Sequence, residues 1–154
     1  MTIDATDLRI LRQLQEHGRL TNVDLAARVG LSPSPCLARV KAMEKSGVIN
    51  RYVALVNPDA LDLGIIVFIQ VALERQVESA LETFEARMLA FDEVMECYLM
   101  TGDSDYLVRL VVKDMASLQR FITKELTTIP GVANIRSSFA LKQVKYKTAL
   151  PTVR

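Results

Sequence analysis

The chain has 154 residues, 50% of them hydrophobic and 24% charged, a composition that excludes intrinsic disorder and allows one or two small domains. Its longest apolar run, 63–71, is interrupted by Gly64 and Gln70 and falls well short of the ~20 residues of a membrane span, so it predicts a core strand. The 2 cysteines stand far apart and there is 1 histidine, which argues against a disulfide framework and a structural zinc site. Asp4 and Asp7 interrupt any signal-peptide pattern, so we expect a cytoplasmic protein with no membrane contact.

Positive charge is concentrated in one short segment. The net charge is only +1, but between residues 28 and 51 five basic residues stand against one acidic residue. The five are Arg28, Arg39, Lys41, Lys45 and Arg51. Such focusing is typical of a nucleic-acid contact, and a solvated helix face is the alternative.

The first part of the chain predicts three short helices, over residues 4–18, 21–30 and 32–47. Gly30 suits a left-handed helix end, and Pro33 suits the first position of a helix, where its missing N–H is not needed. Two helices joined by a three- to four-residue turn with a glycine have the spacing of a helix-turn-helix. A trihelical unit without a DNA role is the alternative.

The segment 48–56 is rich in β-branched and aromatic residues and ends at Asn57 and Pro58, so it predicts a wing or connecting strand. After it, strands alternate with helices. We expect strands at 65–73, 94–101, 106–113 and 132–145, and helices at about 77–90 and 115–126. This βαββαβ order predicts a ferredoxin-like sandwich, and the chain as a whole an α+β protein with a winged helix-turn-helix domain at 1–60 and a second domain at 61–154.

One strand of the second domain is apolar on both faces, through Leu107, Val108, Leu110, Val111 and Val112. An antiparallel sheet with helices on one face needs a cover for the other, and a second copy of the same sheet is the simplest cover. We therefore expect an obligate homodimer.

The third helix carries the expected DNA contacts. We place Leu37, Val40 and Met43 on its core face, so that Arg39 points outward and can bond guanine O6 and N7, while Ala38 can touch a thymine methyl group. Phosphates are the expected partners of Lys41, Lys45, Arg28 and Arg51. The expected DNA-binding residues are Ser32, Pro33, Ser34, Pro35, Ala38, Arg39, Lys41, Lys45 and Arg51.

The turn at 102–105 contains two carboxylates, Asp103 and Asp105. As a general acid/base pair they lack partners, because the only histidine, His17, is far away in the first helix. As a metal site they offer too few ligands. A hairpin turn, with Gly102 at positive φ, is the remaining reading from the residues alone. We expect no catalytic site, no metal and no cofactor.

Several longer motifs resemble one family. The runs 25–40 (LAARVGLSPSPCLARV) and 44–49 (EKSGVI) are similar to the DNA-binding domain of the leucine-responsive regulatory protein and AsnC family. The runs 96–107 (ECYLMTGDSDYL) and 129–132 (IPGV) resemble its amino-acid-sensing domain. The resemblance extends from about Asp4 to the last expected strand. It implies a transcription regulator that binds double-stranded DNA, not an enzyme.

The resemblance also implies a site for a free amino acid, in a loop between the dimers of a tetramer or octamer. Main-chain N–H groups at Gly102 and Asp103 would receive the carboxylate of the amino acid, and Asp103 or Asp105 its ammonium group. Leu99, Met100 and Met115 could supply apolar walls. The expected effector-binding residues are Leu99, Met100, Thr101, Gly102, Asp103, Asp105, Ile135 and Ser137.

Some relatives have two hydroxyl residues where this chain has Ile135 and Ser137. This difference favours an apolar effector such as leucine. The competing reading of the whole chain is a ferredoxin-like small-molecule-binding or enzyme domain joined to a helical module that does not bind DNA.

Overall fold

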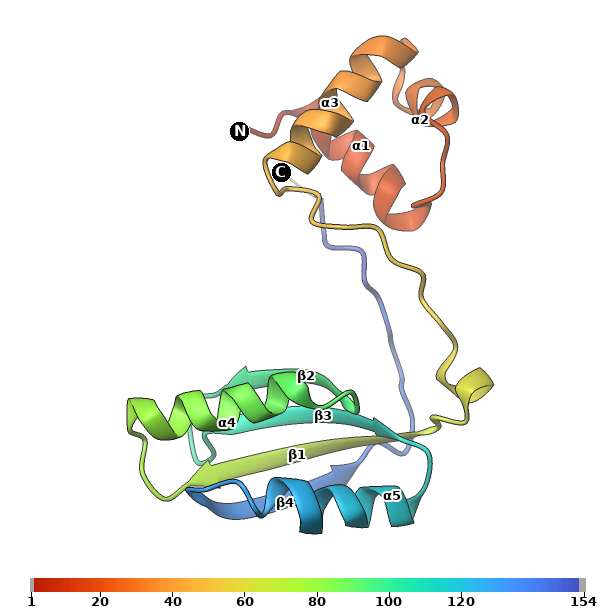
Figure 1. The fold of residues 1–154 in the computed structure, drawn as a ribbon. Coiled ribbons are helices and arrows are strands. Elements are labelled where there is room, and N and C mark those ends of the chain that lie inside the picture. Colours follow the sequence, from red (N-terminus) through yellow and green to blue (C-terminus); the bar gives the residue numbers. More distant parts are fainter. Residues whose placement is uncertain (1, 153–154) are drawn as a thin grey trace. The chain divides into compact units, whose positions relative to one another are not determined.

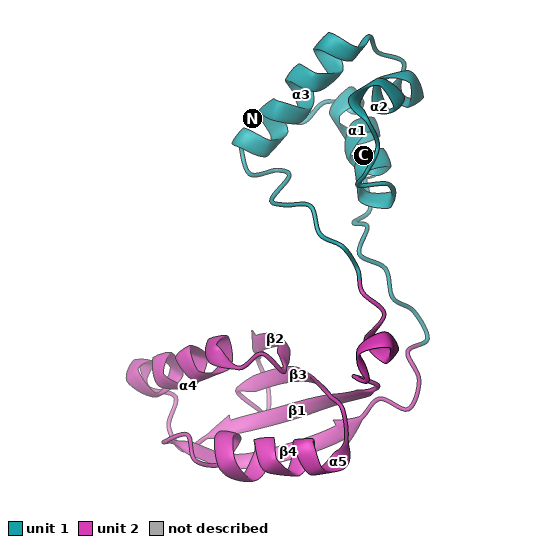
Figure 2. Cartoon of the chain, turned by 45° about the vertical axis from the view of Figure 1, so that its right-hand side comes forward, with its two compact units in different colours: residues 1–55, 144–154 teal, residues 56–143 magenta. Residues whose placement is uncertain are grey.

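The computed structural model describes residues 2–152, so the first residue and the last two of the expected domains lie outside it. The chain forms two compact units, Met1–Leu55 with Val144–Arg154, and Val56–Gln143 (Figure 2). The grouping differs from the expected domains in the final segment, which belongs to the first unit, whereas the expected second domain runs from 61 to 154.

The first unit contains three helices, α1 (Ala5–Glu16), α2 (Asn22–Val29) and α3 (Pro33–Lys45) (Figure 1). The Asp4 carboxylate accepts the Asp7 N–H at 2.8 Å, and the Asp7 carboxylate accepts the Asp4 N–H at 3.1 Å, so the two cap α1 reciprocally. Gly30 ends α2 at φ 71°, in the left-handed conformation expected for it. The three expected helices are therefore confirmed, and the local signals that begin and end them act as the sequence predicts.

The core of this unit corrects one expectation about α3. Cys36, Val40 and Met43 face the core, together with Ile10 of α1, whereas Leu37 is 41% exposed. Val40 and Met43 therefore face the core as expected, but Cys36 takes the core position expected for its apolar neighbour Leu37. Burial raises the pKa of the Cys36 thiol, as expected of a core cysteine.

The expected strand over residues 48–56 is wrong, since these residues form turns and irregular chain in the structure. Val53, Leu55 and Val56 have strand-like composition but are each more than 60% exposed. A strand exists only where another strand accepts and donates its main-chain hydrogen bonds, and residues 48–56 pair with none of the described strands. The segment is a linker.

The C-terminal segment joins the first unit through α1. The Gln15 side chain accepts the Leu150 N–H at 2.6 Å and donates to the Leu150 carbonyl at 3.2 Å. Arg12 donates to the hydroxyl and the carbonyl oxygen of Thr152. The chain therefore crosses between the two units twice, once in each direction.

The second unit is an antiparallel sheet in the order β2-β3-β1-β4, with its helices on one face (Figure 1). After a short 3-10 turn at Pro58–Leu61, its elements are β1 (Ile65–Leu73), α4 (Glu78–Ala90), β2 (Val94–Leu99), β3 (Tyr106–Val112), α5 (Met115–Arg120) continued by a π-helical turn (Phe121–Leu126), and β4 (Val132–Phe139). This order confirms the ferredoxin-like fold. The last strand ends at Phe139, six residues earlier than expected. The Ala140 N–H still donates to the Ile66 carbonyl of β1 at 3.0 Å, and the chain after it is irregular.

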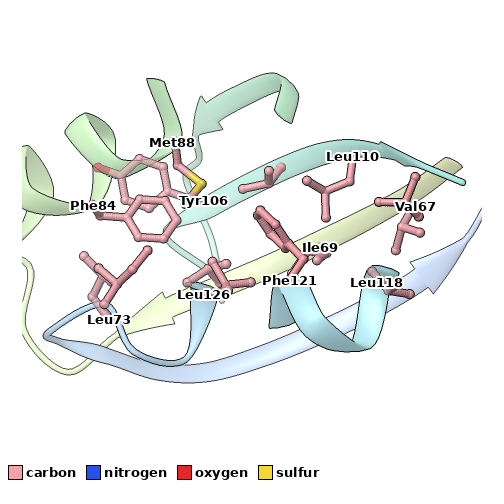
Figure 3. Packing of buried hydrophobic residues seen from close by; sticks show 14 residues of the cluster. Val67, Ile69, Leu73, Phe84, Met88, Tyr106, Leu110, Leu118, Phe121 and Leu126 are labelled. Atoms are coloured by element: carbon pink, nitrogen blue, oxygen red, sulfur yellow. The ribbon is translucent and has the colours of Figure 1, made fainter. Parts of the chain in front are cut away.

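The core lies between the sheet and its helices. Val67 and Ile69 of β1 are fully buried against side chains from α4 and α5, including Phe84 and Leu118 (Figure 3). The Tyr106 ring lies 4.4 Å from that of Phe84, and its hydroxyl donates to a glutamate of α4 at 2.8 Å. These buried side chains identify the face of the sheet that the helices cover. Because successive residues of a strand point to opposite faces, they also show which face every other strand residue lies on.

The opposite face of the sheet carries Ile66, Phe68 and Leu107, which are only partly buried. Arg109 on the same face donates to Glu96 at 2.9 Å. None of the helices in the described part of the chain is long and apolar enough to cross a membrane.

Candidate nucleic-acid interface and ligand pocket

The angle between α2 and α3 is set by a three-residue turn and one side chain. Gly30, Leu31 and Ser32 connect the two helices, and the Asn22 amide donates to the Pro33 carbonyl at 2.8 Å. This bond joins the first turn of α2 to the first turn of α3. The sequence analysis did not identify Asn22, because no spacing rule marks a contact across the turn.

The outer face of α3 begins with small side chains, which allow another molecule to come close to the helix. Ser34 and Ala38 are small and exposed, and Lys41 and Lys45 follow on the same face at one-turn spacing. Small residues at the start of a recognition helix allow it to enter the major groove, and the lysines behind them suit phosphates. The structure exposes eight of the expected DNA-binding residues, namely Ser32, Pro33, Ser34, Pro35, Ala38, Lys41, Lys45 and Arg51.

Arg39 does not lie where a guanine reader is needed. Its Nη1 lies 2.7 Å from Asp4 Oδ2 and 2.8 Å from Asp7 Oδ1, so the guanidinium closes the N-terminus of α1. The Asp7 side chain is 3% exposed, and removing its partner would leave a buried carboxylate uncompensated. The neighbouring carboxylates raise the pKa of Arg39, and hydrogen bonds from Asp7 N–H and Arg39 lower the pKa of Asp4. A base contact by Arg39 would require these bonds to break, and its expected base-reading role stays a prediction.

Glu44, the single acidic residue between positions 28 and 51, is hydrogen-bonded to Tyr52 of the linker. The Tyr52 hydroxyl donates to Glu44 Oε1 at 3.0 Å. Burial and this hydrogen bond raise the pKa of Tyr52 to about 12, so it remains a donor at neutral pH. The outer face of α3 therefore keeps its positive charge.

The loop between β2 and β3 is fixed by Asp105. The Met100 N–H donates to the Asp105 carbonyl at 2.8 Å and closes the loop, and Gly102 adopts φ 120°, as the turn reading requires. The Asp105 carboxylate is buried and accepts the Leu73 N–H at 2.6 Å and the Gln76 amide. Both of its oxygens are engaged within the protein, and the expected contact of Asp105 with the ligand's ammonium group stays a prediction.

A pocket of about 280 Å³ lies against this loop. Its lining comes from the loop (Met100, Thr101, Asp103, Ser104), from β1 (Gln70, Ala72) and from β4 (Asn134, Arg136). The lining is polar and includes one carboxylate and one guanidinium, which is the charge combination that complements a zwitterion. Sequence reasoning missed the residues from β1 and β4, because only the strand register places them beside the loop.

Ile135 and Ser137 lie on the other face of the sheet. They pair with Val71 and Ile69, which are buried under the helices, whereas Arg136 pairs with Gln70 beside the loop. Ser137 instead lines a groove of about 380 Å³ with residues of α5 and the end of β4, namely Met115, Leu118, Gln119, Ile122, Thr123 and Phe139. Within one chain the structure therefore does not bring Ile135 and Ser137 to the loop.

Leu99 is also separated from the loop pocket. It is 60% exposed at the end of β2 and lines a different pocket, between β2 and α4. Thus Met100, Thr101 and Asp103 are brought together as expected, with Gly102 between them. Within residues 2–152 no group of three or more histidine, cysteine or acidic side chains is arranged to hold a metal ion.

Comparison with known proteins agrees with both parts of this geometry. Residues 3–50 match the winged helix-turn-helix DNA-binding model, and residues 66–150 match the Lrp/AsnC ligand binding domain. The chain is 47% identical to the Bkd operon transcriptional regulator of Pseudomonas aeruginosa, over 97% of both chains. It is 43% identical to the leucine-responsive regulatory protein of Haemophilus influenzae, over 93% of this chain and 86% of that one.

Among solved structures, a transcriptional regulator of Neisseria meningitidis in complex with L-Met superposes with a TM-score of 0.93. It is 44% identical, and the match covers 97% of each chain. An AsnC family transcriptional regulator of Agrobacterium tumefaciens has a TM-score of 0.91 at 40% identity and 96% coverage of both chains.

Proposed function

Because the chain belongs to the Lrp/AsnC family of DNA-binding transcription regulators, we propose that the ligand of its second domain is an apolar amino acid, leucine or one of similar size such as methionine. The observation that carries the proposal is the separation of a polar loop pocket from an apolar groove beside Ser137. A zwitterion with an apolar side chain needs one surface of each kind.

The loop is the proposed site for the charged groups of the amino acid. Asp103 is exposed at the pocket and pairs with the ammonium group, while main-chain N–H groups at Gly102 and Asp103 receive the carboxylate. Met100 and Thr101 complete this half of the site. The buried Asp105 keeps the loop in shape and does not touch the ligand.

The groove beside α5 is the proposed site for the ligand's side chain. Met115, Ile122 and Phe139 make its walls apolar, and Ser137 adds a single hydroxyl group. Ile135 lies on the same face of β4. A lysine or aspartate side chain would lose its water here without gaining an ionic partner, which disfavours a strongly polar ligand.

The two halves of this site come from different copies of the chain. In one copy the loop pocket and the groove lie on opposite faces of the sheet, so one amino acid cannot reach both. The proposed assembly begins with a homodimer that covers Ile66, Phe68 and Leu107, and dimers associate further to a tetramer or octamer. The L-Met complex of the Neisseria relative supports the ligand class, and the partly buried apolar side chains of the sheet support the dimer.

The proposed DNA-binding mode places α3 of each subunit in the major groove. Two-fold symmetry then requires half-sites about one helical turn apart, or a multiple of it. Phosphate contacts by Lys41, Lys45 and Arg51 make the affinity fall steeply with salt. The regulator works in the cytoplasm, where DNA and free amino acids are both present.

A thermal-shift screen of the full chain against the twenty amino acids tests the ligand. A ligand at 100 times its dissociation constant stabilises the native state by ~2.7 kcal/mol. Leucine or methionine should raise the melting temperature in wild type and not in Asp103→Asn, whereas the matched control Asp59→Asn, also exposed but away from the loop, should respond as wild type does. Stabilisation by lysine or aspartate and none by leucine or methionine would contradict the proposal.

Light scattering after size exclusion tests the assembly. A dimer or larger species is expected at micromolar concentration. A monomer under these conditions would remove the homodimer, and with it the composite ligand site.

A further inference from the structure

With Arg39 engaged by α1, the first two turns of α3 offer few groups that can read bases. The Arg39 guanidinium bonds the carboxylates of Asp4 and Asp7 at 2.7 and 2.8 Å. The exposed polar side chain that remains near the start of the helix is Ser34, with Ser32 at the cap. Both bonds use Nη1, so a bidentate contact with guanine through both terminal nitrogens would require them to break.

The same turns carry an exposed apolar surface. Leu37 is 41% exposed, although Cys36 and Val40 beside it are buried, and Ala38 next to it is exposed as well. Lys41 lies one turn further along the same side of the helix. The exposed side chain of Leu37 lies beside the charged side chain of Lys41, on the helix proposed to enter the major groove. This pair complements a binding partner with an apolar group surrounded by negative charge.

The major groove of DNA offers this combination at thymine. The C5-methyl group of thymine is the apolar feature on the groove floor, and phosphates flank it on both strands. Ala38 has no side chain beyond Cβ, so it allows the helix to come close enough for Leu37 to touch a methyl group. Lys41 then lies on the side of the backbone.

We propose that Leu37 reads thymine by apolar contact with its C5-methyl group and is a specificity-determining residue of the DNA-binding domain. The inference extends the DNA-binding function of the family by naming the residue and the chemical group that it recognises. It predicts that the half-site contains thymine at the positions facing the first two turns of α3.

The test replaces thymine by deoxyuridine, which pairs identically but lacks the methyl group. A duplex is selected from a randomised pool with the full-length protein, and each thymine is then exchanged in turn. At one or two positions of each half-site, wild type should bind the uracil duplex about fourfold more weakly, the equivalent of ~0.8 kcal/mol for one buried methyl group. For Leu37→Ala, the ratio of the affinity for the thymine duplex to that for the uracil duplex, here called the thymine-to-uracil ratio, should fall to about one at those positions.

Two variants serve as controls. Leu89→Ala truncates a leucine that is 89% exposed on α4 of the other unit, and it should keep the fourfold ratio. Leu37→Gln keeps the length of the side chain and its helix propensity at a half-exposed position, and it should lose the ratio as Leu37→Ala does, so the test does not depend on one variant folding. Circular dichroism melts verify that both variants at this position are folded.

Salt separates this contact from the phosphate contacts. Between 50 and 200 mM salt the affinity of every duplex should fall together, while the thymine-to-uracil ratio of wild type stays constant, since methyl burial releases no counterions. Two results would overturn the proposal: no position sensitive to the methyl group in wild type, or an equal ratio in wild type and Leu37→Ala. Either leaves DNA binding intact, whereas loss of salt-dependent binding to all duplexes would concern the family function itself.

Discussion

Asp103 and Asp105 are two residues apart in one loop, yet Asp103 is exposed and Asp105 is buried, and substitution tests the different roles proposed for them. Asp105 is 6% exposed and accepts the Leu73 N–H at 2.6 Å. Asp105→Ala removes that acceptor and leaves the buried Leu73 N–H unpaired. A hydrogen bond to a charged group contributes about 1.5–3 kcal/mol to stability, and this is the range of the expected loss. The Gln76 amide, the second donor, can turn to water and adds little.

We therefore expect Asp105→Ala to lower the free energy of unfolding of the second unit by about 2 kcal/mol. For a domain of 60–100 residues this corresponds to a fall in melting temperature of roughly 8–16 °C. Asp105→Asn keeps a neutral acceptor for the Leu73 N–H and should lose about half as much. Thermal and urea unfolding of the full chain, followed by circular dichroism, give both quantities.

Asp103→Ala is the matched control. Its side chain is exposed, and a surface substitution of this kind changes stability by less than ~0.5 kcal/mol. Equal stability of the Asp103→Ala and Asp105→Ala proteins would refute the assignment of Asp105 as the residue that holds the loop. Unchanged ligand stabilisation in Asp103→Ala would leave the loop without its proposed partner for the ammonium group.

Three further outcomes follow from the charges and thiols. Arg39→Ala should lower the melting temperature of the first unit, because it unpairs the buried Asp7, and should not relax base preference at any guanine; selection of operator sequences with the variant checks the second part. The pKa of Asp4 is lowered in the folded state, so its contribution to stability is present above the unfolded pKa near 4 and is lost as the pH falls through the folded value; an acid titration of the melting temperature should show a smaller fall in Asp4→Asn than in wild type. Burial, with the charge of Glu85, raises the pKa of Cys97 to about 11, so thiol reagents at pH 8 should modify it slowly in native protein and rapidly in urea.

Local signals in the sequence predicted local structure well. The left-handed end of α2 at Gly30, the start of α3 at Pro33 and the positive φ of Gly102 each depend on residues close to one another in the chain. Such features are determined by backbone geometry and short-range hydrogen bonds, which the sequence displays directly. The βαββαβ order was predictable for a similar reason, since each element has its own periodicity.

Contacts between residues far apart in the chain were not predictable from the sequence. Arg39 meets Asp7 across 32 positions and Asp105 meets Leu73 across 32, and no spacing rule encodes either pair. Ile135 and Arg136 show a different limit: alternation says that neighbours on β4 face opposite sides, but only the pairing with β1 decides which side is which. The relatives' pattern predicts Ile135 and Ser137 as ligand contacts, which stays a prediction, and it does not say where they lie in one subunit.

The placement of the loop pocket and the Ser137 groove on opposite faces of the sheet has a thermodynamic consequence for regulation. Under the proposed arrangement, Asp103 of one copy and Ser137 of another hold the same amino acid, so the ligand binds the assembled state more tightly than separate subunits. By linkage, the ligand then favours assembly by the same factor by which assembly raises its affinity. Since each subunit carries one α3, the number of associated dimers decides how many half-sites are bound at once, and multivalency turns a modest change in assembly into a large change in occupancy of the DNA.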